Sequence, residues 1–75
     1  MPIFMVTARI VAKREEASTS SCYISFADAD GKAREFEVNS RDYAKFATGD
    51  IGRLSYDQVG RYVRFEPGEM AFHLR

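Results

Sequence analysis

Apolar and polar residues alternate with a period of two along the start of the chain, a pattern typical of a β-strand. We expect this strand to cover residues 3–14. One face takes Val6, Ala8, Ile10 and Ala12, and the other takes Met5, Thr7, Arg9, Val11 and Lys13. Because such a strand is long, it is expected to bend or to pair with two neighbours, as strands of small barrels do.

Alternation returns in four shorter stretches, which predict strands over residues 21–27, 33–38, 51–57 and 61–66. In the second strand, the inward set is Cys22, Ile24 and Phe26. The first two of these stretches are joined by residues 28–32, where Asp30-Gly31 supplies the positive φ that a hairpin turn requires.

The period changes between residues 38 and 51. Asn39 and the polar residues after it offer an N-cap, and Asp42 suits the positive end of a helix. Tyr43 and Phe46 lie three residues apart, so both can face the core. These features predict a short helix over residues 40–47 that Gly49 ends.

A Pro-Gly turn precedes the C-terminal stretch, which alternates again and predicts a sixth strand. Its apolar side is formed by Met70, Phe72 and Leu74. Together the elements predict one mostly β domain over residues 1–75, an OB-like antiparallel barrel of five to six strands. The helical turn falls between strands three and four. An SH3-like barrel is the alternative, but it would place its helical turn between the last two strands.

A set of residues in fixed order resembles the bacterial family known as domain of unknown function 2500. The resemblance covers about residues 6–66, and the segment 49–54 is its most specific part. The residues that carry it are Lys13, Arg14, Tyr23, Phe26, Asp30, Gly31, Arg34, Glu35, Phe36, Val38, Asp42, Tyr43, Gly49, Asp50, Gly52, Leu54, Tyr56, Gly60, Arg61, Tyr62 and Phe65. The resemblance implies a small β domain, generally carried behind a membrane-spanning segment, and it implies no catalytic residues.

Charge is balanced along the chain, since eleven Lys and Arg offset eleven Asp and Glu. A protein that binds duplex nucleic acid normally concentrates positive charge, and this sequence does not. A net charge near zero opposes self-association only weakly. No stretch approaches the about 20 apolar residues of a membrane span. Since the one cysteine also excludes an internal disulfide, we expect a cytoplasmic chain, although the resemblance leaves open a membrane-anchored relative.

The candidates for chemistry have simpler structural interpretations. Cys22 shares a strand face with apolar residues and is expected to be buried. His73 has no carboxylates at ligand spacing. Glu35 and Glu37 are expected on a solvated strand face. Asp30-Gly31 is expected in a hairpin turn, because the Gly and Glu that a calcium-binding loop requires do not fall at the right positions. We therefore expect no enzyme, no metal site and no cofactor.

The sequence does not define a biochemical activity, and the leading hypothesis is a non-catalytic protein-interaction or self-association module. The candidate contact residues are Arg53, Arg61, Tyr62, Arg64, Met70, Phe72 and Leu74. Arg64 is predicted on the same face as Tyr62. A homodimer is predicted to form through exposed strand edges or through the apolar side of the tail. The alternative is an OB-like module for single-stranded nucleic acid, which Glu35 and Glu37 on its binding face disfavour.

Overall fold

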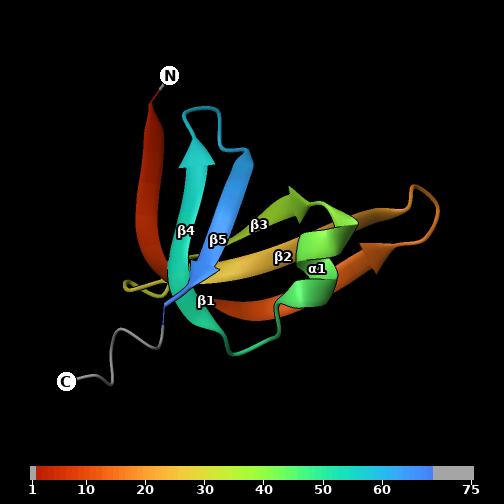
Figure 1. The fold of residues 1–75 in the computed structure, drawn as a ribbon, viewed down its shortest axis with the longest axis horizontal. Coiled ribbons are helices and arrows are strands. Elements are labelled where there is room, and N and C mark those ends of the chain that lie inside the picture. Colours follow the sequence, from red (N-terminus) through yellow and green to blue (C-terminus); the bar gives the residue numbers. More distant parts are fainter. Residues whose placement is uncertain (1, 69–75) are drawn as a thin grey trace.

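The computed structural model describes residues 2–68 and shows a mostly β fold with one short helix (Figure 1). The sheet is antiparallel throughout, with strand order β3-β2-β1-β4-β5. The predicted sixth strand with Met70, Phe72 and Leu74 lies outside the described residues. The elements in chain order are β1 (Ile3–Glu16), β2 (Ser21–Asp28), β3 (Ala33–Val38), α1 (Ser40–Lys45), β4 (Ile51–Asp57) and β5 (Tyr62–Pro67).

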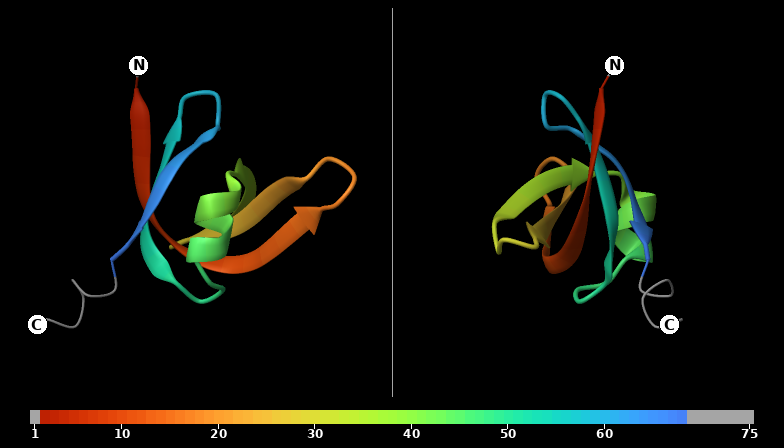
Figure 2. Two further views of the ribbon diagram at one scale, coloured as in Figure 1. Left: turned by 45° about the vertical axis from the view of Figure 1, so that its right-hand side comes forward. Right: turned by 90° about the vertical axis from the view of Figure 1, so that its left-hand side faces the viewer.

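Strand β1 serves both halves of the sheet, as its length predicted. Its residues 3–9 pair with β4, whereas residues 8–16 pair with β2. The strand curves between the two halves, so that β4 and β5 cross over β2 and β3 (Figure 2). In each half of β1, one edge is therefore hydrogen-bonded to a neighbouring strand, and the other edge has no neighbouring strand among the described residues.

A β-bulge at Val11 changes the faces of β1, and here the alternation gave a wrong prediction. Ile10 pairs with Phe26, but the next partner of β2 is Ala12. The extra residue reverses the alternation, so Ala12 is exposed and the side chain of Lys13 turns inward. The Lys13 ammonium donates to the Phe46 carbonyl at 2.7 Å and so anchors the chain just after α1.

The core lies between the two curved halves of the sheet and beneath α1. The inward orientation predicted for Cys22, Ile24 and Phe26 is confirmed, since all three are buried. Aromatic contacts dominate: the Phe65 ring lies 5.1 Å from both Phe26 and Phe46, centroid to centroid. The ten buried apolar residues are Ala8, Ile10, Cys22, Ile24, Phe26, Phe36, Val38, Phe46, Leu54 and Phe65.

The sheet does not close into the predicted barrel. Strands β3 and β5 approach each other, yet no ladder joins them within residues 2–68, so they remain the two edges of an open sheet. The all-β prediction is confirmed, and the helix lies between β3 and β4 as expected. No helix in this part of the chain is long and apolar enough to cross a membrane.

Helix α1 begins as predicted and ends earlier. The Asn39 side chain caps it by accepting from the Asp42 amide at 2.7 Å. The helix stops at Lys45 because Phe46 is already extended, with φ of −104°. The positive φ of Gly49, 101°, belongs to the turn that follows. There the Asp50 carboxylate accepts from the Ala47 amide at 3.0 Å.

The hairpins β2–β3 and β4–β5 are built by the same turn. Asp28 and Asp57 each accept two backbone amides with one carboxylate oxygen, at 2.8–3.1 Å. Gly31 and Gly60 follow three residues later with φ of 85° and 89°. The pattern Asp-x-x-Gly followed by Lys or Arg occurs in both turns, at 28–32 and 57–61. Side-chain hydrogen bonds therefore hold both turns in addition to the strand ladders.

Candidate functional site

The residues predicted to form one partner-binding group on the last hairpin do not share a face. A second bulge lies in β5, where Ser55 pairs with Arg64 but Tyr56 pairs with Tyr62. Val63 is the extra residue, so Tyr62 turns toward the core and Arg64 turns to the outer face. The prediction that Tyr62 and Arg64 lie on one face is therefore wrong.

Tyr62 ties β5 to α1. Its hydroxyl donates to Asp42 at 2.7 Å, and its ring stacks 6.4 Å from that of Phe26, centroid to centroid. Burial raises the pKa of Tyr62, and the hydrogen bond to the Asp42 carboxylate raises it further. A hydroxyl already committed to a neighbour inside the fold is poorly placed to contact a partner.

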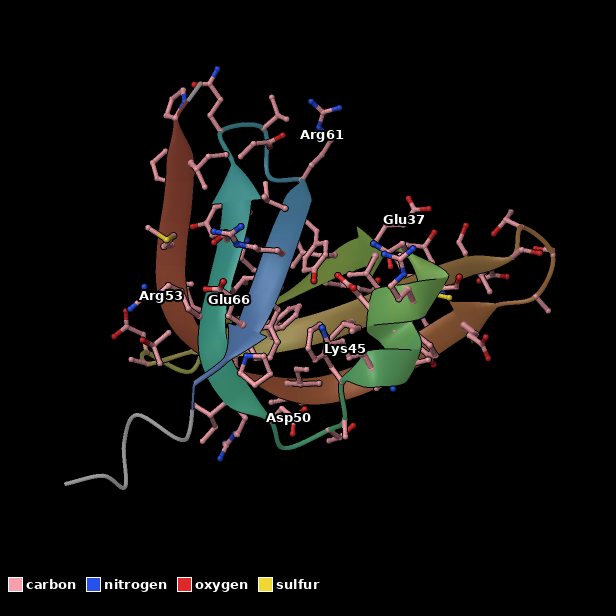
Figure 3. All side chains as sticks on the ribbon, viewed as in Figure 1. Glu37, Lys45, Asp50, Arg53, Arg61 and Glu66 are labelled. Atoms are coloured by element: carbon pink, nitrogen blue, oxygen red, sulfur yellow. The ribbon has the colours of Figure 1, made fainter. Side chains whose placement is uncertain are left out.

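Arg61 lies at the hairpin end, apart from Arg53 (Figure 3), whereas the register places Arg53 and Arg64 on the same outer face. Arg61 lies at the hairpin and donates to the Asp57 carboxylate at 3.2 Å. Arg64 lies 3.6 Å from Glu66, and Arg53 is the ladder partner of the same glutamate. Exposed pairs of this kind contribute little energy, and they leave no concentrated positive patch among these residues.

The outer face of β2 and β3 has the position that an OB-like module would use for nucleic acid, and here that face is occupied. The Arg14 guanidinium covers the Tyr23 ring at 4.3 Å and makes two hydrogen bonds of 3.0 Å to Glu35. The hydrogen bonds from Arg14 lower the pKa of Glu35, which therefore stays charged. Glu37 is exposed beside it, as predicted. The aromatic face is covered and negative charge remains, so base stacking and phosphate binding are both disfavoured.

The sequence candidates for chemistry can be placed only in part. Cys22 is buried in the core, as expected. Within residues 2–68, no group of three His, Cys, Asp or Glu side chains lies close enough to hold a metal ion. His73 lies outside that range.

Among the cavities that border the open sheet, two adjoin β3. The first is a groove of about 280 Å³ between β3 and β5, with Glu37 on one wall and Arg61 on the other. The second is a small cavity of about 30 Å³ on the inner face, lined by Val6 and Ala8 of β1 together with residues of β2, β3 and β4. Both have charged residues in their lining, and the second also has the apolar side chains that β1 contributes.

The unpaired strand edges differ sharply in charge. Strand β3 carries Arg34, Glu35 and Glu37, and β5 carries Arg64 and Glu66. The C-terminal half of β1 is also charged, since residues 13–16 are Lys-Arg-Glu-Glu. Charged side chains protect an edge strand from pairing with another chain. Each of these edges is therefore guarded.

Residues 3–7 of β1 form an edge without such protection. They pair with β4 on one side, and β2 ends at Asp28, opposite Ala8. Ile3, Phe4 and Met5 are exposed at 46%, 47% and 58%, although all three are large and apolar. An exposed apolar edge is a surface for strand addition. The sequence offers a signal for it, the absence of charge from Ile3 to Ala8, which becomes informative only once the pairing is known.

Comparison with solved structures supports the resemblance. A crystal structure from Klebsiella pneumoniae, described as domain of unknown function 2500, is similar with a TM-score of 0.76 and 26% identity. The match covers 85% of this chain and 96% of that one. A crystal structure from Proteus penneri matches with a TM-score of 0.79 and 22% identity, over 89% of this chain and 93% of the other. No family model and no curated protein matches the sequence.

Proposed function

We propose that this chain, which resembles domain of unknown function 2500 in its fold, is a non-catalytic protein-interaction module. It binds an extended polypeptide segment that adds to the sheet at residues 3–7 of β1. The observation that carries the proposal is the contrast between this apolar edge and the charged edges elsewhere in residues 2–68. Main-chain hydrogen bonds would provide affinity, and alternate side chains would provide specificity.

The surrounding structure supports this assignment. Phe4 lies beside Tyr56, with centroids 5.7 Å apart, so its ring extends the inner surface of the sheet to the edge. The β4–β5 hairpin supports the strand from the other side, because β4 pairs with residues 3–9. An added strand would therefore meet a fixed edge with an apolar side chain on each face.

The test is affinity capture from a lysate of the source cell, with and without nuclease, using three forms of the chain. Met5→Lys places a charge on the edge, and Val59→Lys makes the same change at a hairpin position, 67% exposed, outside residues 3–7. We expect wild type and Val59→Lys to retain the same proteins after nuclease treatment, and Met5→Lys to lose them.

Amide hydrogen exchange on the captured complex locates the contact. Strand addition would slow exchange in residues 3–7 and leave β3 and β5 unchanged. Equal capture by Met5→Lys and wild type would refute the proposed edge. Loss of every captured protein after nuclease would favour single-stranded nucleic acid, and anisotropy with short oligonucleotides at rising salt would then measure it.

A further inference from the structure

We propose that the segment that adds to this edge is β1 of a second copy of the chain, in an antiparallel arrangement with a twofold axis at Met5. The inference rests on the proposed function and specifies its partner. It joins two five-stranded sheets through one new ladder, in the isologous manner that is common among homodimers.

The unpaired stretch is suited to pairing with itself. With the axis at Met5, Ile3 lies opposite Thr7 of the second copy, and Phe4 lies opposite its Val6. These pairs respect the two faces of the strand, because odd positions meet odd positions and even positions meet even ones. No other register uses the whole of residues 3–7 symmetrically. Every side chain in the new ladder is uncharged.

The inner face provides a matching contact for the exposed aromatic ring. Val6 lines the small inner cavity, whose other lining residues are partly apolar, such as Ala8 and Phe26, and partly charged, such as Lys32 and Arg34. In the proposed register, Phe4 of the second copy lies beside Val6 and covers the mouth of that cavity. The ring is 47% exposed in the single chain, so its burial favours association.

Charge and shape also permit the arrangement. The chain has a formal net charge of zero, so two copies do not repel each other overall. The N-terminal half of β1 stands at the outer border of the sheet, and no described element covers its outer side in any view (Figures 1 and 2). Because the ladder is short, the dimer should be weak and should dissociate on dilution.

The decisive experiment is a charge swap at Met5, followed by analytical ultracentrifugation over a wide range of concentration. The twofold axis places the two copies of residue 5 opposite each other. Met5→Lys alone and Met5→Glu alone therefore each bring like charges together, and we expect each to associate at least about tenfold more weakly than wild type. An equal mixture of the two variants should recover association, because the charges are then opposite.

Val59→Lys is the matched control and should associate as wild type does, since residue 59 lies in the β4–β5 turn. A strictly monomeric wild type at the highest concentration would overturn the inference, as would association of Met5→Lys equal to that of wild type. Failure of the mixture to associate would also overturn it. A monomeric wild type whose captured proteins depend on Met5 would leave the proposed function standing with a different partner.

Discussion

Gly52 allows β5 to pack directly against β4, and replacing it with alanine should strongly destabilise the fold. The residue pairs with Ala8 on one side and Pro67 on the other. A Cβ atom at this position would overlap the carbonyl oxygen of Glu66 and lie 2.6 Å from the Pro67 Cα. All of these are backbone atoms, so rotation of a side chain cannot relieve the contact.

The size of the effect follows from two opposing contributions. Alanine in a strand is ordinarily favoured over glycine by roughly 0.5–1 kcal/mol. Overpacking costs about 1–3 kcal/mol, and a clash with backbone falls at the upper end of that range. The expected net loss is therefore about 2 kcal/mol, a large part of the roughly 4–10 kcal/mol that a domain of this size possesses. At about 4–8 °C per kcal/mol, the unfolding midpoint should fall by about 8–16 °C.

Urea and thermal unfolding followed by circular dichroism measure this loss. Gly31→Ala is the control, because its Cβ would meet nothing within 4 Å while its φ of 85° is unfavourable for alanine. That variant should lose only the about 1–2 kcal/mol of a left-handed alanine. In Gly52→Ala, amide exchange should also accelerate at Gly68, whose N–H donates to Ile51 at 2.9 Å. A Gly52→Ala midpoint equal to or above that of wild type would refute the close approach of β5.

Three further substitutions test the side-chain contacts. Tyr62→Phe removes the hydrogen bond to Asp42 and should cost about 1–2 kcal/mol at neutral pH in urea unfolding. Because the pKa of Tyr62 is raised in the fold, the stability that its hydroxyl contributes is present below about pH 10 and is lost as pH rises. The difference in free energy of unfolding between Tyr62→Phe and wild type should therefore narrow in alkali. Glu35→Gln weakens the contact with Arg14, and thermal unfolding midpoints measure the effect. Because the pKa of Glu35 is lowered in the fold, the difference in midpoint between the variant and wild type should vanish as pH falls below about 4. Asp57→Asn retains an acceptor for the turn amides and should lose less stability than Asp57→Ala; equal losses in thermal unfolding would show that the charge matters more than the turn.

Period-two alternation predicted the strands well and failed at the two bulges. Nothing in the local sequence marks Val11 or Val63 as an extra residue. Each bulge lies within a pairing of two consecutive strands, β1 with β2 and β4 with β5. The β1 bulge falls where the strand passes from one partner to the other, which is a tertiary requirement. Faces beyond a bulge are reversed, and this is why Lys13 turned inward and Tyr62 separated from Arg64.

The missed features were of two kinds. The shared turn pattern at 28–32 and 57–61 is visible in the sequence and could have predicted that both hairpins are alike. The apolar edge of β1 could not be found in this way, because an uncharged strand segment such as residues 3–8 is the same in sequence whether it is central or at an edge. Only the end of β2 opposite Ala8 shows that residues 3–7 lack a second neighbour.

The residues that carry the family resemblance contact one another within the chain. Lys13 lies 4.4 Å from the Tyr43 ring, and Arg34 lies 4.8 Å from that of Tyr56.

Arg14 with Tyr23 and Glu35, and Asp42 with Tyr62, are pairs within the same set. Because these side chains satisfy each other inside one chain, they stabilise the fold and leave few groups for a ligand. The pattern begins at about residue 6, whereas the unprotected edge occupies residues 3–7 and contributes almost nothing to it. A similar fold therefore does not imply the same partner, and the edge of β1 has to be tested in this chain itself.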